Sequence, residues 1–269
     1  MEVIRAPIIG NCQLAPGCYR LCIQAPAVAA AAVPGQFLHV RCGSTLDPFL
    51  RRPISINDTD RLEGRVYLLY RVAGRGTALL AQKAVGDVLD VMGPLGRGFD
   101  LEVGGGEREN ILAVAGGIGI APVFFLLKEL FQRGVTADVF YGAASAGELV
   151  LRREIEHMGH RLHTATDDGT AGFGGRVTEL LASYLSAGRA VKGARFYGCG
   201  PRPMLAELCR LAGAFGLKGE ISWEERMACG VGACLGCACK VKGDEKGGAV
   251  FRRTCTDGPV FAAGEVVFD

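Results

Sequence analysis

The sequence carries almost no net charge and few aromatic residues, and each shortage excludes something. Lysine and arginine total 30 against 28 acidic residues, which gives a formal net charge of +2 over 269 residues. Domains that hold nucleic acid through bulk charge carry a basic surplus gathered in patches, so nucleic acid is not an expected partner. Aromatic residues make up 7% of the chain, with one tryptophan. We therefore expect a core built from valine, leucine, isoleucine and alanine.

Signals for export and for membrane insertion are also missing. The segment Met1–Gly10 lacks the basic start, apolar run and small-residue cleavage site of a secretory signal, so a cytoplasmic location is expected. The uncharged stretch Ile111–Leu127 is close to the lower limit of about 17 residues for a transmembrane helix. Three glycines and Pro122 interrupt it, which favours a buried strand, a glycine turn and a helix over a membrane span.

Cysteine and glycine, in contrast, are abundant, with 11 and 40 residues. A disulfide framework is typical of small secreted domains that cannot bury a sufficient core, and this chain is long enough to bury one. An odd number of cysteines also leaves at least one thiol unpaired in any such framework. In a reducing cytoplasm, clustered cysteines more often bind metal. The four histidines fall in no pattern with the cysteines, and no role is predicted for them.

The first part of the chain, residues 1–103, contains short apolar runs separated by turn residues. Six runs at close spacing predict an antiparallel β-barrel or a sandwich, and we favour the barrel. The alanine-rich stretch Ala25–Val33 has helix propensity but is bracketed by Pro26 and Pro34, so a helix and a loop both remain open. The predicted strands are Val3–Ile9, Tyr19–Ile23, Gln36–Arg41, Pro53–Ile56, Val66–Val72 and Val88–Met92.

Strands and helices alternate in residues 104–220, after the loop Gly104–Glu107. This alternation predicts a doubly wound parallel sheet with helices on both faces. From residue 221 to residue 269 the alternation stops, and the segment is too short for a free-standing domain of ordinary size. The predicted fold class is multi-domain, with an all-β barrel, an α/β domain and a small C-terminal segment. The predicted strands are Ile111–Ala115, Ala137–Tyr141, Leu162–Thr166 and Ala194–Tyr197, and the predicted helices are Pro122–Gln132, Leu149–His157, Val177–Leu185 and Pro203–Phe215.

The C-terminal segment contains the strongest motif in the chain. Cys229, Cys234 and Cys237 are spaced C-x4-C-x2-C, and Cys255 follows at a distance, which is the plant-type [2Fe–2S] spacing. Small residues between the cysteines let backbone amides approach the sulfide atoms. A structural zinc site is the alternative, although such sites usually pair two short C-x2–4-C units and only one is present here. Cys239 could replace Cys237, but only Cys237 completes the spacing.

Three fragments of the predicted barrel could hold a phosphate or a flavin. In Arg51–Ser55, an arginine can clamp a phosphate with its planar fork, and the serine offers a hydroxyl. Leu69–Arg71 adds a ring for stacking, and Gly74–Thr77 predicts a glycine turn with free amides. A pair of arginines on a strand is more often a solvated face, so the three fragments together are stronger evidence than any one of them.

Two glycine–proline turns follow predicted strands of the α/β domain. Ala115–Pro122 opens a helix with proline in its first turn, and Cys199–Met204 again lies between a strand and a helix. The first turn departs from the G-x-G-x-x-G fingerprint because Pro122 takes the sixth position. Two such turns at strand ends mark the crevice where open parallel sheets bind ligands. Asp167 and Asp168 end a third strand, where they could hold a ribose hydroxyl and repel a 2′-phosphate, or simply form a turn.

The order of these motifs resembles that of the ferredoxin–NADP reductase superfamily. Within it, Glu224–Cys234 and Thr254–Phe261 resemble the electron-transfer subunits of NAD-dependent dihydroorotate dehydrogenases, and the resemblance runs from about Arg52 to Phe261. It implies FAD, a [2Fe–2S] cluster and NAD as cofactors. The implied FAD contacts are Arg52, Pro53, Ile54, Ser55, Leu69, Tyr70, Arg71, Gly76 and Thr77, the nicotinamide region involves Gly117, Gly119, Cys199, Gly200 and Glu224, and the implied cluster ligands are Cys229, Cys234, Cys237 and Cys255.

The resemblance also implies a function and a partner. A nicotinamide exchanges two electrons as a hydride and a [2Fe–2S] cluster exchanges one, so a flavin is needed between them. Electrons would run from dihydroorotate through the FMN of a catalytic partner subunit, then the cluster and FAD, to NAD in pyrimidine biosynthesis. The expected assembly is a heterotetramer with two copies of each subunit. No catalytic acid, base or nucleophile is expected in this chain.

Other functions remain open at this point. The same modules occur in NAD(P)H-linked subunits of cytosolic hydrogenases and of ferredoxin–NADP oxidoreductase complexes. A redox-sensing protein with a regulatory cluster predicts neither FAD nor NADH–dye reductase activity. A zinc-stabilised binding module predicts a colourless protein.

Overall fold

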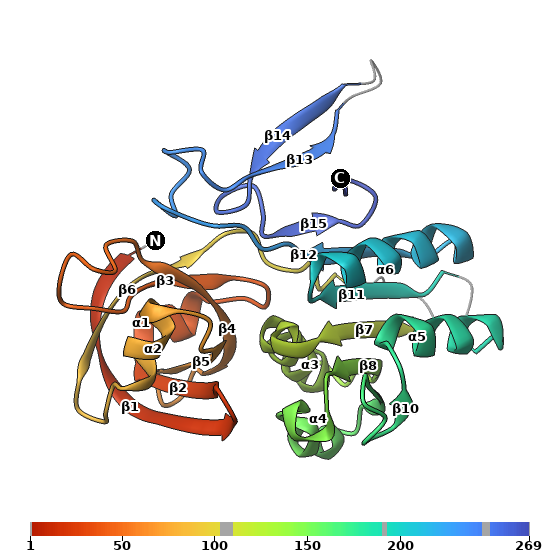
Figure 1. The fold of residues 1–269 in the computed structure, drawn as a ribbon, viewed down its shortest axis with the longest axis horizontal. Helices are drawn as coiled ribbons and strands as arrows, with labels where there is room; N and C mark the ends of the chain where they lie inside the picture. The colour runs from red at the N-terminus through yellow and green to blue at the C-terminus, as the bar shows by residue number, and fades with distance from the viewer. Residues whose placement is uncertain (1, 103–109, 190–192, 244–247, 269) are drawn as a thin grey trace.

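The computed structural model describes residues 2–102, 110–189, 193–243 and 248–268. Within them, the first part is a closed antiparallel barrel in the strand order β1-β2-β5-β4-β3-β6, drawn at the left of Figure 1. Its core is mostly aliphatic, as the scarcity of aromatic residues predicts. Each predicted strand is present, and the barrel prediction is confirmed. The strands are β1 (Glu2–Ala15), β2 (Cys18–Gln24), β3 (Phe37–Arg41), β4 (Arg52–Asp60), β5 (Arg65–Arg71) and β6 (Val88–Leu95).

Two short helices interrupt the barrel strands. The alanine-rich stretch, for which the sequence allowed a helix or a loop, forms helix α1 (Pro26–Ala31). Pro26 lies in the first turn of this helix, where no amide donor is needed. Helix α2 (Arg75–Ala81) corrects the prediction of a simple glycine turn at this point. The Thr77 hydroxyl accepts hydrogen bonds from the Ala73 and Gly74 amides, at 2.9 and 3.2 Å, which satisfies donors at the start of the helix.

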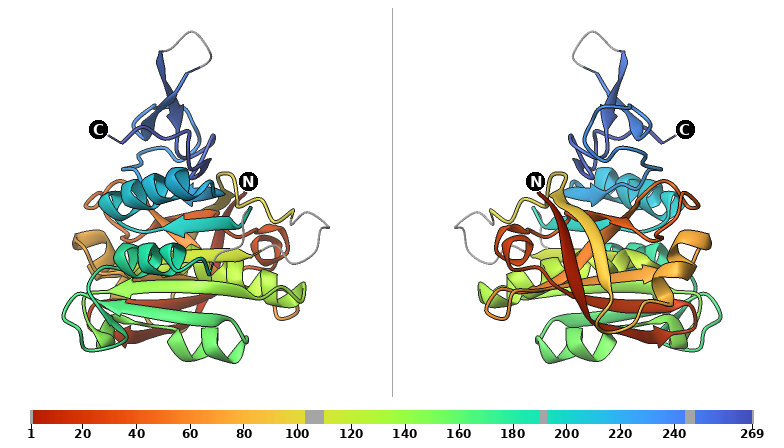
Figure 2. Two further views of the ribbon diagram at one scale, coloured as in Figure 1. Left: turned by 90° about the vertical axis from the view of Figure 1, so that its right-hand side faces the viewer. Right: turned by 90° about the vertical axis from the view of Figure 1, so that its left-hand side faces the viewer.

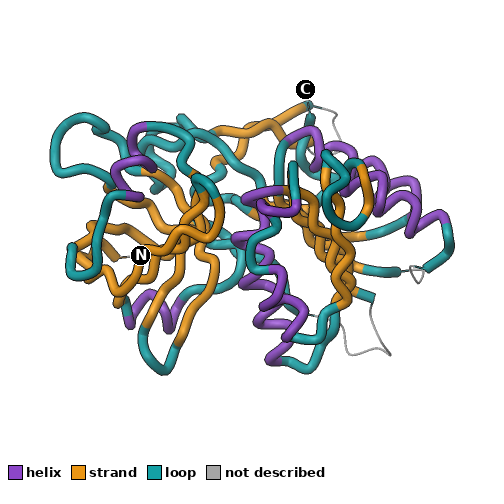
Figure 3. The backbone as a smooth tube through the Cα atoms, turned by 60° about the horizontal axis from the view of Figure 1, so that its bottom comes forward, coloured by secondary structure: helices purple, strands orange, loops and turns teal. Residues whose placement is uncertain are grey.

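The second part is a sheet in the order β10-β9-β8-β7-β11-β12-β15, parallel throughout except for β15. Helices α3 and α4 bury their apolar faces on one side of it, and α5 and α6 on the other. Figure 3 shows these helices in purple flanking the strands. The doubly wound prediction is confirmed. The elements are β7 (Ile111–Gly116), η1 (Gly117–Gly119), α3 (Ile120–Gln132), β8 (Ala137–Ala143), η2 (Ala146–Glu148), α4 (Arg152–His157), β9 (Arg161–Thr166), β10 (Phe173–Gly174), α5 (Val177–Ser186), β11 (Arg195–Cys199), α6 (Arg202–Phe215) and β12 (Lys218–Ser222).

The C-terminal segment is tied to the α/β sheet by its last strand. Strand β15 (Val260–Ala262) pairs antiparallel with β12, while β13 (Ala238–Lys242) and β14 (Ala249–Arg253) form a hairpin that projects from the body in Figure 2. The division predicted at residues 220 and 221 falls inside β12, and the one predicted at residues 103 and 104, with the loop Gly104–Glu107, lies outside the described residues.

The uncharged stretch Ile111–Leu127 is divided between β7 and the first part of α3, with a glycine turn between them. In the described ranges, no helix is long and apolar enough to span a membrane. The stretch is uncharged because both elements are buried, β7 in the middle of the sheet and α3 between the sheet and the barrel.

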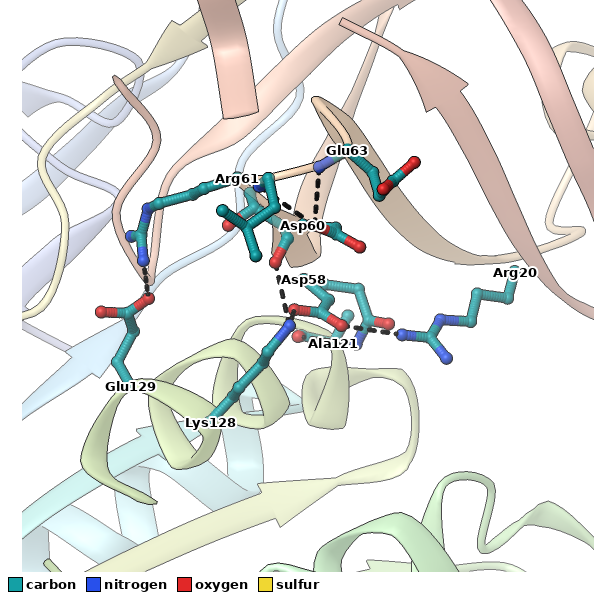
Figure 4. Close-up of polar contacts among 11 residues, drawn as sticks. Arg20, Asp58, Asp60, Arg61, Glu63, Ala121, Lys128 and Glu129 are labelled. Carbon is teal, nitrogen blue, oxygen red and sulfur yellow. Dashed lines mark hydrogen bonds and ion pairs between the residues drawn. The ribbon is translucent and has the colours of Figure 1, made fainter. Parts of the chain in front are cut away.

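Helix α3 also fastens the α/β domain to barrel strand β4, as Figure 4 shows. Asp58 on β4 is 7% exposed, and its carboxylate accepts hydrogen bonds from the Arg20 guanidinium at 3.2 Å and from the Lys128 ammonium at 2.6 Å. Beside it, the Asn57 amide donates to the Ala121 carbonyl at 3.1 Å. These contacts fix β4, which carries the predicted flavin motif, against the start of α3, which carries the predicted nicotinamide turn.

Replacing Asp58 with alanine should lower the free energy of unfolding by about 1.5–3 kcal/mol. Two charged hydrogen bonds are lost, and the Arg20 and Lys128 side chains lose the carboxylate that neutralises both of them. The exposed Arg152–Glu156 pair on α4 should be worth less than ~1 kcal/mol. Urea unfolding of Asp58→Ala and of the control Arg152→Ala measures both losses. Equal losses in the two variants would contradict the importance of this interface.

Candidate functional site

A cavity of about 320 Å³ opens between the barrel and the α/β domain. Its walls include Pro53–Ser55 on β4, Leu69–Arg71 at the end of β5, and Ser222–Glu225 after β12. The structure therefore brings the predicted flavin residues of two strands together with the C-terminal segment. Tyr70 is 2% exposed and its hydroxyl donates to Asn11 at 3.2 Å, so it supports the cavity mainly from the barrel core.

The remaining predicted flavin residues do not line the cavity: Gly76 and Thr77 lie in the first turn of α2, and Arg52 begins β4 beside it. A Cβ placed on Gly76 would stand 3.0 Å from the Arg52 Nε, so the guanidinium rests against the first turn of the helix. Arg52 also donates to the Leu50 carbonyl at 2.7 Å. Helix α2 follows Ala73, which lines the cavity. A cation at a helix start close to a cavity suits the phosphate end of a ligand whose other end fills that cavity.

A second cavity, of about 260 Å³, lies where the parallel neighbours β7 and β11 end. Gly117, Gly119 and Gly200 line it, which places both predicted glycine–proline turns in one crevice. The turns touch at Gly119, where a Cβ would stand 2.2 Å from the Cys199 carbonyl oxygen. Glycine is required at position 119 because no side chain can occupy that space.

Arg71 and Glu224 line both cavities and so mark their junction. Burial raises the pKa of the Glu224 carboxyl, and the Arg71 guanidinium is paired with Glu148 at 2.6 Å. Cys199 is 1% exposed and lines neither cavity, and burial, followed by the Glu224 carboxylate, raises the pKa of its thiol. Cys199 therefore supports the crevice as a neutral thiol beneath its surface.

A third cavity, of about 660 Å³, continues from Gly117 across the ends of β8 and β9 to the start of α5. Asp167 lines it. The Asp168 carboxylate instead accepts hydrogen bonds from the Thr170 amide at 3.0 Å and its hydroxyl at 2.6 Å. Asp167 faces the crevice, where the ribose contact was predicted. Asp168 instead stabilises a turn, which was the alternative interpretation of this acidic pair.

The four predicted cluster cysteines meet in two pairs. The Cys229 thiol lies within interaction distance of the Cys234 thiol, and the Cys255 thiol within interaction distance of the Cys237 thiol, while all four thiols are free. In the part of the chain that the structure describes, no group of three or more Cys, His, Asp or Glu side chains is arranged to hold one metal ion. Two thiol pairs are the donor set for two irons, because each iron of a [2Fe–2S] cluster takes two protein ligands. The residues present therefore fit this cluster.

Backbone amides of the cluster loop, residues 229–237, point at the cysteine sulfurs. The Val231 amide is the main cause that lowers the pKa of the Cys229 thiol, to about 6. Amides directed at thiolates are the feature expected around an iron–sulfur cluster. The amide-to-sulfur hydrogen bonds are Val231 to Cys229 at 3.4 Å, Gly232 to Cys255 at 3.2 Å and Gly236 to Cys234 at 3.4 Å.

Cys239, the alternative third ligand, packs away from the pairs. It is 3% exposed and joins Val241 in the core beneath the parallel sheet, where burial raises the pKa of its thiol. Cys237 instead packs beside Cys255. The structure therefore brings Cys237, the residue that the spacing favours, to the other cysteines.

The first cavity and the cysteine pairs share a wall. Phe37 and Met227 line the cavity and also pack against Cys237 and Cys255. One layer of side chains thus separates this cavity from the cysteines.

Two residues near these sites, Trp223 and His39, carry no prediction from the sequence. Trp223 lines the first cavity, donates its indole N–H to Glu225 at 3.1 Å, and carries the Arg202 guanidinium 4.8 Å above its ring. A lone tryptophan beside Glu224 was the available signal. His39 was also missed: it is fully buried on β3, and burial followed by the Arg51 charge lowers its pKa to about 4.

Solved structures resemble the chain over most of its length. The NADH-dependent reduced ferredoxin–NADP oxidoreductase, studied for flavin-based electron bifurcation, matches 99% of this chain and 91% of its own with a TM-score of 0.85 and 29% identity. The ferredoxin–NADP⁺ reductase of Neisseria gonorrhoeae with bound FAD and NADP matches 80% and 92%, with a TM-score of 0.64 and 18% identity, a likeness of fold alone. The barrel, the sheet and the cavity between them define an oxidoreductase of the ferredoxin–NADP reductase class.

Sequence relatives narrow this class. Residues 113–210 match the oxidoreductase NAD-binding domain, and residues 224–267 match the iron–sulfur cluster binding domain of dihydroorotate dehydrogenase B. The dihydroorotate dehydrogenase B (NAD(+)) electron transfer subunit of Desulforamulus reducens is 42% identical, covering 100% of this chain and 99% of the relative. That of Bacillus caldolyticus is 43% identical, covering 93% and 92%. The chain belongs to the family of dihydroorotate dehydrogenase B electron transfer subunits, as its motifs predict.

Proposed function

We propose that this chain relays electrons between a dihydroorotate-oxidising catalytic subunit and NAD⁺. FAD, when bound, exchanges two electrons with a nicotinamide and single electrons with an iron–sulfur cluster. The observation that carries the proposal is the first cavity, whose lining combines β4, the Ile118 turn, Glu224 and Met227. Residues for all three cofactors thus meet at one place.

The cavities and the cysteine pairs support the residues that we assign to each cofactor. Arg52 and the α2 start would hold the FAD phosphates, and the β4 and β5 residues the flavin ring. The glycine turns would hold the nicotinamide against that ring, with Asp167 at the far end of the crevice. We assign FAD to Arg52, Pro53, Ile54, Ser55, Leu69, Tyr70, Arg71, Gly76 and Thr77, NAD to Gly117, Gly119, Gly200 and Glu224 with the buried Cys199 supporting their crevice from beneath, and a [2Fe–2S] cluster to Cys229, Cys234, Cys237 and Cys255.

The partner in this proposal is an FMN-containing catalytic subunit, in a cytoplasmic heterotetramer with two copies of each chain. The cluster loop supports docking at this point, because Cys234 is exposed and the neighbouring Val231 and Leu235 are 38% and 63% exposed. Exposed apolar side chains around a redox centre suit contact with another protein. Light scattering of the purified complex measures the stoichiometry.

The test is to purify the chain with the catalytic subunit of the same organism and to assay dihydroorotate-dependent reduction of NAD⁺. The proposal predicts this activity in the complex, and only NADH–dye reductase activity in the isolated chain. NADP⁺ should be a poor acceptor because Asp167 would face its 2′-phosphate. Reduction of ferredoxin by NADPH, without dihydroorotate activity in the complex, would instead favour the ferredoxin–NADP oxidoreductase alternative.

A further inference from the structure

His39 lies between the two redox sites without taking part in either assigned ligand set. It is on β3, where it pairs with Pro53 of the flavin strand and with Met92 on β6. On its other side its ring rests against the cluster loop, since a Cβ on Gly230 would stand 2.6 Å from the His39 Nδ1. Gly230 adopts φ +72°, so this loop position favours glycine in both backbone and space.

The ring is fully buried, yet its polar atoms are unsatisfied. His39 has 0% exposure, and among the described residues neither ring nitrogen completes a hydrogen bond. The Arg51 backbone lies near enough to favour a ring N–H but does not complete a bond. A buried donor without a partner costs free energy, and such groups in native proteins are nearly always paired. The ring therefore keeps a donor available to a group held by the adjoining loop.

The cluster loop makes an acceptor the fitting partner. Gly230 directly follows Cys229, so the ring meets the loop beside one of the thiol pairs. Sulfide and thiolate sulfurs are acceptors, as a neutral imidazole N–H requires. The apolar residues packed with Cys237 and Cys255 are Phe37, Met92, Leu95 and Met227, and the Arg253 guanidinium lies within electrostatic reach of the same two thiols.

We propose that the His39 Nδ1–H donates a hydrogen bond to the iron–sulfur cluster and raises its reduction potential. This inference rests on the proposed function, in which the four cysteines hold that cluster. A donor stabilises the extra negative charge of the reduced cluster, and hydrogen bonds to the sulfurs are among the factors that set such potentials. His39 would thus be a positioning and tuning residue on the electron path, supplied by the flavin barrel.

The test compares the holoprotein with His39→Leu, which removes the donor, and His39→Gln, which keeps one. EPR-monitored redox titration should show that His39→Leu lowers the equilibrium constant for one-electron reduction of the cluster about tenfold. The reduction potential of the cluster should therefore fall by about 59 mV. His39→Gln should recover at least part of this shift. The matched control is His160→Gln, because His160 is buried far along the sheet and both its nitrogens are bonded, to the Ala137 amide and the Leu127 carbonyl. It should leave the potential unchanged.

A measurement on the unaltered protein decides the question even if His39→Leu does not fold. ENDOR spectroscopy of protein labelled with ¹⁵N-histidine should detect a coupling of the reduced cluster to an imidazole ¹⁵N. It should also detect a coupling of the reduced cluster to an exchangeable proton. The absence of both, or a potential that is the same in all variants, would overturn the inference and leave the N–H directed at the Arg51 backbone. Failure of the proposed function looks different, since it predicts no iron and no EPR signal in the unaltered protein.

Discussion

Replacing Cys255 with serine should remove the cluster from this chain while leaving the flavin in place. Cys255 closes the second thiol pair with Cys237 and accepts the Gly232 amide. We expect iron content to fall at least about tenfold, and dihydroorotate-dependent NAD⁺ reduction in the complex to fall about 100-fold. NADH–dye reductase activity should persist, because the FAD and nicotinamide cavities lie on the other side of Phe37 and Met227. Iron analysis, flavin absorbance and both assays measure these effects.

Cys239→Ser is the matched control. Its thiol is buried in the core beneath the sheet rather than in a cysteine pair, so iron content and relay activity should stay close to those of the unaltered protein. If Cys239→Ser lost the cluster and Cys255→Ser kept it, the assignment of the third and fourth ligands would be wrong.

Replacing Gly119 with alanine should disable hydride exchange with the nicotinamide. The new Cβ would stand 2.2 Å from the Cys199 carbonyl oxygen, which is backbone and cannot rotate away. The two turns of the crevice must then separate, and a displacement of about 1 Å at a reacting site costs about 100-fold in rate. Stopped-flow reduction of the bound flavin by NADH measures this rate, with FAD and iron content unchanged.

Gly213→Ala in α6 controls for the added methyl group. No atom lies within 4 Å of the position of its Cβ, and a helix gains up to about 1 kcal/mol from alanine over glycine. Flavin reduction should be as fast as in the unaltered protein. Equal rates in Gly119→Ala and Gly213→Ala would show that the crevice does not hold the nicotinamide.

Much of the fold could be predicted because its signals are local. Apolar runs at close spacing give the barrel strands, and the strand–helix alternation gives the doubly wound sheet. Helix α2 was missed because Gly74 and Gly76 lower helix propensity, whereas the Thr77 hydroxyl satisfies its start in the structure. The pairing of β15 with β12 joins segments that are distant in the sequence, so no local sequence pattern predicts it.

The candidate site divides in the same way. The cysteine spacing and the glycine turns are contiguous, so their residues could be named from the sequence. The proposed choice of Cys237 over Cys239 draws on packing, because the structure places Cys237 beside Cys255 and Cys239 in another part of the core. The contact of His39 with Gly230 joins the barrel to the C-terminal segment, and it depends on the whole fold.

In the proposed relay, one chain connects a nicotinamide to an iron–sulfur cluster through a flavin. Anaerobic titration of the purified chain with NADH, followed by visible absorption and EPR, tests it most directly. FAD accepts two electrons and the cluster one, so we predict flavin bleaching, a reduced-cluster signal, and an end point near ~1.5 NADH per chain. Flavin bleaching complete at about one NADH per chain, with no cluster signal, would contradict the relay.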